Sequence, residues 1–76
     1  MSKEKYDRAF VTTFNLASVD EELKYNGIPE WDSIGHMALM AELETEFDIA
    51  LETDDIIEFE SYKKGMEILK KYGVEI

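Results

Sequence analysis

The amino-acid sequence predicts an all-α protein, a small four-helix bundle made of three main helices and a short helix that stands third in the chain. Apolar residues recur at spacings of four in two long segments. Residues that cap helices precede three of the four expected helices. The alternating pattern of a half-buried strand is absent. With 76 residues and a mass of 8.8 kDa, residues 1–76 are expected to form a single domain.

The first helix is expected to run from Lys3 to about Ala17. Within it Tyr6, Phe10 and Phe14 are spaced by four and predict one buried stripe. A long connection follows over residues 18–31, with a short helical turn expected at residues 20–24 and a turn at residues 26–29. Ordered connections longer than about 12 residues are uncommon and often functional.

The second helix is expected to begin at Asp32 and to end at Phe47 or Asp48. The Asp32 carboxylate is a good N-cap for the amide of Ile34 or Gly35, and Trp31 is expected to pack back on the first turn. The helix has two faces, which the spacing separates. The core stripe is Leu39, Leu43 and Phe47 with Met40 and His36 beside it, and the other strip is Ile34, Met37 and Ala41, flanked by Glu42 and Glu44.

Two shorter helices are expected to complete the bundle. Thr53 is expected to cap a short helix over residues 54–57. Ser61 is expected to cap a last helix from Tyr62 to Tyr72, which Gly73 ends. Its inward residues are expected to be Tyr62, Met66, Leu69 and Tyr72.

Composition excludes several classes of function. Without cysteine, and with one histidine, we expect neither a disulfide framework nor a metal site. The chain holds 18 acidic and 8 basic residues, and a net charge of −10 disfavours nucleic acid and anionic membranes as partners. No apolar run is long enough to span a bilayer, and the N-terminus lacks the apolar stretch of a signal peptide. We therefore expect a cytoplasmic monomer.

The negative charge is concentrated in the middle of the chain. Residues 32–62 contain ten acidic and no basic side chains. An acidic surface around an apolar helix favours docking onto a basic partner, and the alternative is an acidic face kept for solubility.

Ser33 is the one candidate site residue with distinctive chemistry. It is expected in the first turn of the second helix, where free amides and the helix dipole favour a phosphate. Helix capping alone would also explain a serine at this place. No acid–base partner set surrounds Ser33, so we expect no catalytic residue and no enzyme.

Four segments of the sequence resemble the acyl carrier proteins. Asp32-Ser33-Ile34 resembles their attachment motif, Asp-Ser followed by Leu, Ile or Met, at the start of the second helix. Residues 43–49, 54–56 and 59–62 resemble the end of that helix, the short third helix and the start of the last helix, in the family order and spacing. The resemblance covers nearly the whole chain and includes its length and acidity.

The resemblance implies that a phosphopantetheinyl transferase attaches 4′-phosphopantetheine from coenzyme A to Ser33, with Asp32 as part of the motif. The thiol of the arm would then hold an acyl or aminoacyl group as a thioester and present it to loading and processing enzymes with basic docking surfaces. Such enzymes would contact a partner-binding strip, which is formed by Ile34, Met37, Ala41, Glu42 and Glu44.

Some residues depart from the family pattern. Gly35 and His36 follow the motif where many carriers of fatty-acid synthesis have polar or acidic residues, and Ala38 replaces a common acid. Together with Trp31, these departures favour a dedicated pathway, such as polyketide or nonribosomal peptide biosynthesis. His36 is more often a packing residue than a functional one, and its role stays open.

Two other classes of function compete with the carrier. An unmodified acidic interaction module would use the same helix without needing Ser33. A calcium sensor is suggested by Asp54, Asp55 and Glu58, but the spaced ligand loop is missing.

Overall fold

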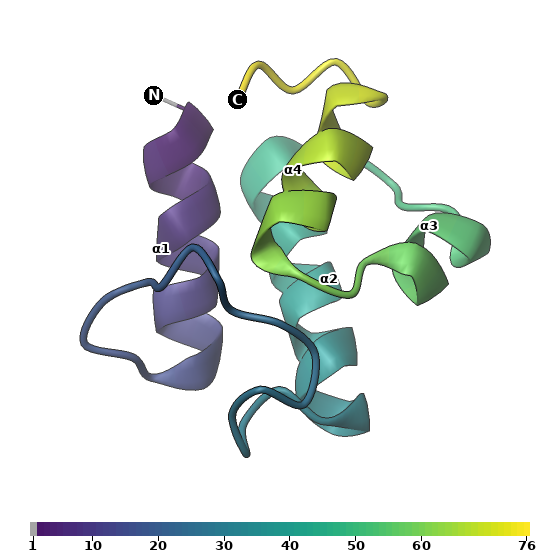
Figure 1. Cartoon of the computed structure of the whole chain (residues 1–76). Helices are drawn as coiled ribbons and strands as arrows, with labels where there is room; N and C mark the ends of the chain where they lie inside the picture. Colours follow the sequence, from purple (N-terminus) through teal and green to yellow (C-terminus); the bar gives the residue numbers. More distant parts are fainter. Residues whose placement is uncertain (1) are drawn as a thin grey trace.

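The computed structural model describes residues 2–76, which form four helices and no strand (Figure 1). The helices are α1 (Ser2–Phe14), α2 (Ser33–Phe47), α3 (Thr53–Glu58) and α4 (Tyr62–Lys70). The chain folds as a small helical bundle with a radius of gyration of 11.0 Å. α1 and α2 run in opposite directions, and the short α3 lies to one side of α2 and α4 (Figure 1). The all-α prediction is confirmed.

α1 is shorter at its C-terminus than the apolar pattern predicts. The helix ends at Phe14, three residues before Ala17, because Asn15 takes the left-handed conformation with φ 55°. The amide of Leu16 then donates back to the carbonyl of Val11 at 3.1 Å. Asparagine tolerates this conformation better than most residues, so a local C-cap overrides the longer pattern.

The core is one aromatic-rich cluster. The predicted stripe of Tyr6, Phe10 and Phe14 is buried, and the rings of Phe10 and Phe14 contact the indole of Trp31. Trp31 is completely buried and stacks on His36, in line with the prediction that it packs back on the start of α2. The other buried apolar residues are Ala9, Leu23, Leu39, Met40, Leu43, Leu51, Phe59, Tyr62, Ile68 and Leu69.

The long connection between α1 and α2 is ordered by backbone hydrogen bonds. No helical turn forms at residues 20–24, where one was expected. A tight turn takes its place, in which the amide of Leu23 donates to the carbonyl of Asp20. An antiparallel bridge then joins Lys24 to Ser61. The amide of Tyr25 donates to the carbonyl of Glu60 at 2.9 Å. The connection is therefore tied to the segment that leads into α4.

The caps of α2 follow the sequence prediction. The carboxylate of Asp32 accepts a 2.8 Å hydrogen bond from the amide of Gly35. Asp48 ends the helix in the left-handed conformation, φ 53°. Leu39, Met40 and Leu43 are buried, as predicted for the core stripe, whereas Phe47 is only half-buried.

The ends of α3 and α4 correct two boundaries. Thr53 is the first residue of α3 and not its cap; Glu52 precedes the helix and makes no side-chain capping bond. Ser61 caps α4 as predicted, accepting from the amide of Lys64 at 3.0 Å. The regular helix ends at Lys70 instead of Tyr72.

The turn after α4 closes on a left-handed glycine. Gly73 has φ 85°, its amide donates to the carbonyl of Lys70, and the amide of Val74 donates to the carbonyl of Leu69. These two bonds form a Schellman motif, which explains the glycine that the sequence places there. Within residues 2–76, no helix has the length and apolar character needed to cross a membrane.

Candidate functional site

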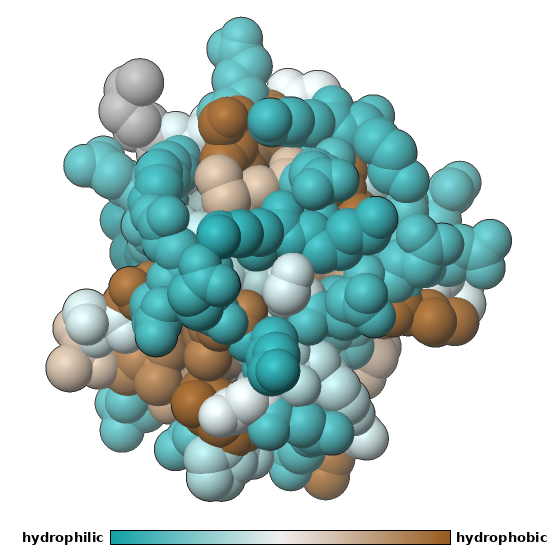
Figure 2. All heavy atoms as spheres, viewed as in Figure 1, coloured by the Kyte–Doolittle hydropathy of each residue, from teal (hydrophilic) through white to brown (hydrophobic). Residues whose placement is uncertain are grey.

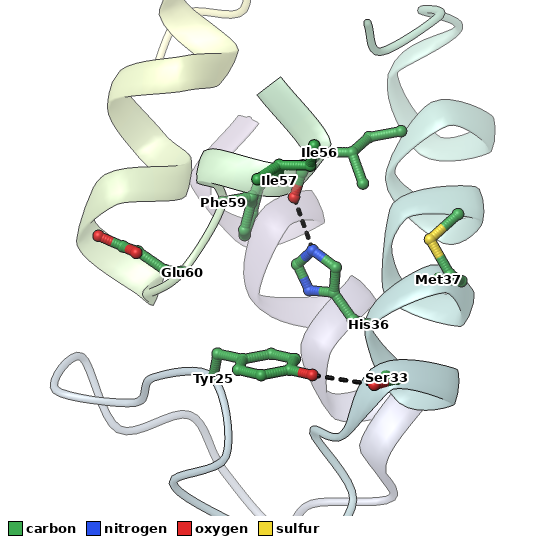
Figure 3. Close-up of a pocket in the computed structure, with 8 residues that line it drawn as sticks. All are labelled: Tyr25, Ser33, His36, Met37, Ile56, Ile57, Phe59 and Glu60. Carbon is green, nitrogen blue, oxygen red and sulfur yellow. Dashed lines mark hydrogen bonds between the residues drawn. The ribbon is translucent and has the colours of Figure 1, made fainter. Parts of the chain in front are cut away.

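Ser33 lies exposed at the start of α2, beside an open pocket of ≈ 390 Å³. The pocket lies between α2 and α3, and Tyr25 of the long connection also lines it (Figure 3). Its lining is mainly apolar. The lining residues are Tyr25, Ser33, His36, Met37, Ile56, Ile57, Phe59 and Glu60.

Among the described residues, the hydroxyl of Ser33 has one hydrogen-bond partner, the hydroxyl of Tyr25. Their oxygens are 3.1 Å apart, and either can be the donor (Figure 3). The two residues come from different elements, Tyr25 from the long connection and Ser33 from α2. The long connection therefore places the side chain of Tyr25 against Ser33, the residue that the sequence indicates as the candidate site.

His36 joins the start of α2 to α3 through both ring nitrogens. Nδ1 lies 2.9 Å from Nε1 of Trp31, and Nε2 lies 2.7 Å from the carbonyl oxygen of Ile56 (Figure 3). The indole nitrogen can only donate, so Nδ1 must accept and Nε2 carries the proton that it donates to Ile56. His36 therefore fixes the wall of the pocket through both ring nitrogens.

Gly35 makes room for the chain itself. A Cβ built at this position would lie 1.9 Å from the carbonyl oxygen of Glu30 and 3.2 Å from the ring of Phe14. Because the backbone of Glu30, just before α2, lies this close to Gly35, the glycine is explained by this close approach. An arm or a partner is not needed to account for it.

The outward face of α2 is apolar and not acidic. Ile34 is 83% exposed and Met37 is 54% exposed, and Ala41 lies exposed on the same face. Across the pocket, Ile57 of α3 is 71% exposed. Hydrophilic atoms cover much of the face in Figure 2, and hydrophobic atoms protrude at the edge where α3 lies. Ile34, Met37 and Ile57 are the large apolar side chains that lie exposed among residues 2–76.

The acids of α2 stand at the margins of this face. Glu42 and Glu44 are half-buried. The carboxylate of Glu44 accepts a 2.8 Å hydrogen bond from the amide of Leu51, which holds the loop after α2. Glu46 pairs with Arg8 of α1 at 3.2 Å. The structure therefore gives Glu44 a structural role beside any role toward partners.

The exposed acids of residues 32–62 belong mainly to the residues around α3. These side chains are Asp32, Asp48, Glu52, Asp54, Glu58 and Glu60. No group of three or more His, Asp or Glu side chains suited to a metal ion occurs among residues 2–76.

The groups with a perturbed pKa lie away from Ser33. The ammonium of Lys71 and the hydroxyl of Tyr72 donate to Asp55 and lower the pKa of its carboxyl. Burial raises the pKa of Tyr6. The pKa of Lys3 is raised by its contacts with Tyr62 and Asp7. These groups hold α1 and α3 against α4, so the shifts reflect structural contacts.

Sequence reasoning missed Tyr25 and the pocket residues of α3 and the segment after it, which are Ile56, Ile57, Phe59 and Glu60. Tyr25 stands in a segment with no helical pattern, and its only signal was the unusual length of the ordered connection. Ile57 and Phe59 belong to the short α3 and its end, where six residues are too few for a face to be separated by periodicity. Comparison of the chain with known protein families, with curated proteins and with solved structures gives no match.

Proposed function

We propose that this protein is a phosphopantetheine-dependent carrier with an acyl-carrier-like fold, which holds acyl or aminoacyl groups as thioesters on an arm attached to Ser33. The observation that carries the proposal is the exposed hydroxyl of Ser33 in the first turn of α2, at the mouth of an apolar pocket. A serine placed in this way is open to a modifying enzyme and stands where helix amides favour a phosphate. The resemblance at Asp32-Ser33-Ile34 adds the identity of the group.

The attachment is a transfer of a phosphoryl-linked group. The Ser33 oxygen attacks the phosphorus of coenzyme A that bears the pantetheine, and a new O–P bond forms. The P–O bond to adenosine 3′,5′-bisphosphate breaks, and this bisphosphate leaves. The transferase takes the hydroxyl proton and supplies Mg²⁺, so the carrier needs no catalytic residue of its own. When attached, the arm provides the thiol that the sequence lacks.

The exposed apolar face of α2 fits the docking role in this proposal. Ile34 and Met37 offer apolar contact next to Ser33, and Ile57 extends the surface onto α3. The exposed Asp32 directly precedes Ser33, and the exposed Asp54 stands three residues before Ile57. Both acids would attract basic partner surfaces. Contacts of mixed apolar and long-range electrostatic character release readily and weaken with salt, as a carrier requires.

The same surface supports a second candidate function, an unmodified acidic interaction module. The exposed side chains of Ile34, Met37 and Ile57 would serve such a module equally well. Only the carrier needs the hydroxyl of Ser33. In either case we propose a cytoplasmic protein, and for the carrier a dedicated biosynthetic pathway.

Intact-protein mass spectrometry tests the proposal. The protein is incubated with coenzyme A, Mg²⁺ and a broad-specificity phosphopantetheinyl transferase. We expect the mass of one phosphopantetheine to be gained by the parent protein and by Ser18→Ala, a matched change at another exposed serine. Ser33→Ala should gain nothing. If the helical parent protein gains no mass with several transferases, the carrier function is refuted and the interaction module is favoured.

A further inference from the structure

We infer that Tyr25 is a positioning residue for the arm, and that its hydroxyl donates a hydrogen bond to the phosphodiester once Ser33 is modified. The inference rests on the proposed carrier function. It starts from one contact, the 3.1 Å between the oxygens of Tyr25 and Ser33. Within residues 2–76, Tyr25 is the side chain that hydrogen-bonds to the Ser33 oxygen, and it comes from outside α2.

The position of Tyr25 is set by its backbone. Its amide donates to the carbonyl of Glu60 at 2.9 Å, and the next bond of the bridge runs from the amide of Tyr62 to the carbonyl of Leu23 at 2.9 Å. These two bonds fix residues 23–25 against the segment that leads into α4. The long connection is therefore a rigid support at this point and not a loose loop.

The ring of Tyr25 is oriented by two aromatic neighbours. It meets the His36 ring edge-on, with centroids 5.5 Å apart and an interplanar angle of 85°. It meets the Trp31 indole at 6.5 Å and 80°. His36 is itself held at both nitrogens, so the ring has a fixed frame to rest on. This packing aims the hydroxyl at Ser33, as Figure 3 shows.

Modification changes what the two hydroxyls can do. Before modification, the hydroxyls of Tyr25 and Ser33 can each donate to the other. Afterwards the Ser33 oxygen carries no proton, so Tyr25 must be the donor. The phosphodiester brings negatively charged oxygens to the same place, and a hydroxyl donates more strongly to an ionised acceptor than to a neutral one. The Tyr25 bond should therefore become stronger when the arm is attached.

Tyr25 also lines the pocket beside Ser33. A hydrogen bond from this side would hold the phosphate end of the arm at the pocket mouth. The remainder of the arm would then start next to the apolar lining formed by Met37, Ile56 and Phe59. Tyr25 would thus fix where the arm begins without taking part in the transfer chemistry.

A thermodynamic cycle on the loaded and unloaded protein tests the inference. The melting midpoints of the unmodified and modified forms are measured for the parent protein, for Tyr25→Phe and for Tyr72→Phe. Tyr25→Phe keeps the ring and removes only the hydroxyl. Tyr72→Phe is the matched control, because its hydroxyl contacts Asp55 and the amide of Glu52 and not Ser33. The quantity compared is the rise in midpoint on modification, so that the direct cost of each substitution cancels.

We expect modification to raise the midpoint of the parent protein and of Tyr72→Phe by about 3 °C more than that of Tyr25→Phe. In the modified parent protein, an NOE should also join the Tyr25 ring protons to the methyl protons next to the phosphate, and this measurement needs no variant. Equal rises in all three proteins, or no such NOE, would overturn the role of Tyr25 while the mass gain leaves the carrier function intact. A protein that gains no mass at all refutes both.

Discussion

The indole of Trp31 donates a 2.9 Å hydrogen bond from Nε1 to Nδ1 of His36. The opposite nitrogen of the same ring lies 2.7 Å from the carbonyl oxygen of Ile56 in α3. Trp31 is fully buried, so its N–H has no access to water in place of this acceptor. One histidine thus satisfies a buried donor and ties α3 to α2 beside Ser33.

This relationship predicts that His36→Leu is destabilising. Leucine preserves apolar packing but leaves the indole N–H of Trp31 and the carbonyl of Ile56 without the ring. We expect the free energy of unfolding to fall by about 1–3 kcal/mol, measured by urea denaturation. The exposed neighbour Met37→Leu is the control and should change stability by less than about 0.5 kcal/mol. Equal stability of the two variants would contradict the bridging role.

Gly35→Ala should destabilise the protein although alanine is the better helix former. By helix propensity alone, alanine would stabilise by up to about 1 kcal/mol. The added Cβ would instead meet the Glu30 carbonyl oxygen at 1.9 Å, and that backbone atom is held by the turn before α2. We expect a net loss of about 1–3 kcal/mol, as for overpacking. Ala41→Gly on the exposed face should cost about 1 kcal/mol and calibrates the propensity effect. A stabilised Gly35→Ala would show that the close approach is wrong.

The acid limb of stability should depend on Asp55. The bond from Lys71, at 2.6 Å, and the bond from Tyr72, at 2.5 Å, hold the pKa of this carboxyl below its usual value. A depressed pKa in the folded state contributes stability above the unfolded value of about 3.9, and the contribution is lost as pH falls through the folded pKa. Asp55→Asn should therefore lose less stability than the parent protein between neutral pH and pH values below about 3.9.

The control for this experiment is the adjacent residue. Asp54 is exposed, so Asp54→Asn should keep the acid dependence of the parent protein. Melting midpoints across the pH range, measured for all three proteins, separate the two positions. If Asp54→Asn flattens the curve as much as Asp55→Asn does, the dependence belongs to the general loss of negative charge.

Added salt should raise the melting midpoint. Of the ten acids in residues 32–62, only Glu46 and Asp55 belong to the ion pairs found within residues 2–76. Repulsion among the remaining acids opposes folding at low ionic strength. Raising ionic strength from about 0.01 M to 0.15 M shortens the screening length from about 30 Å to 8 Å and should stabilise the fold. A midpoint that does not change over this range would contradict the repulsion.

Ile34→Ala should slow loading by the transferase. Ile34 is 83% exposed next to Ser33, so an enzyme that reaches Ser33 must cover it. Loss of that apolar contact should lower kcat/KM by roughly fivefold or more, measured from the time course of mass gain. Thr45→Ala, an exposed change further along α2, is the control and should load normally. Equal rates for both variants would place docking elsewhere.

Much of the fold could be predicted from local patterns. The stripe in α1, the Asp32 cap of α2 and the Ser61 cap of α4 depend on residues close in the chain, so the sequence reveals them. Several helix ends differ from the prediction. Asn15 ends α1 through a backbone conformation, and Thr53 begins α3 where a capping role was expected.

The sequence by itself determined that the chain forms an all-α fold, that Ser33 stands in the first turn of α2 and that negative charge gathers in its middle third. These properties follow from spacing, capping and composition, which are local. Only the tertiary structure decided that Tyr25 meets Ser33, that His36 joins Trp31 to Ile56 and that Gly35 faces the Glu30 carbonyl. Each of these contacts joins separate segments through the path of the long connection or the packing of α3, and no periodicity records where such segments meet.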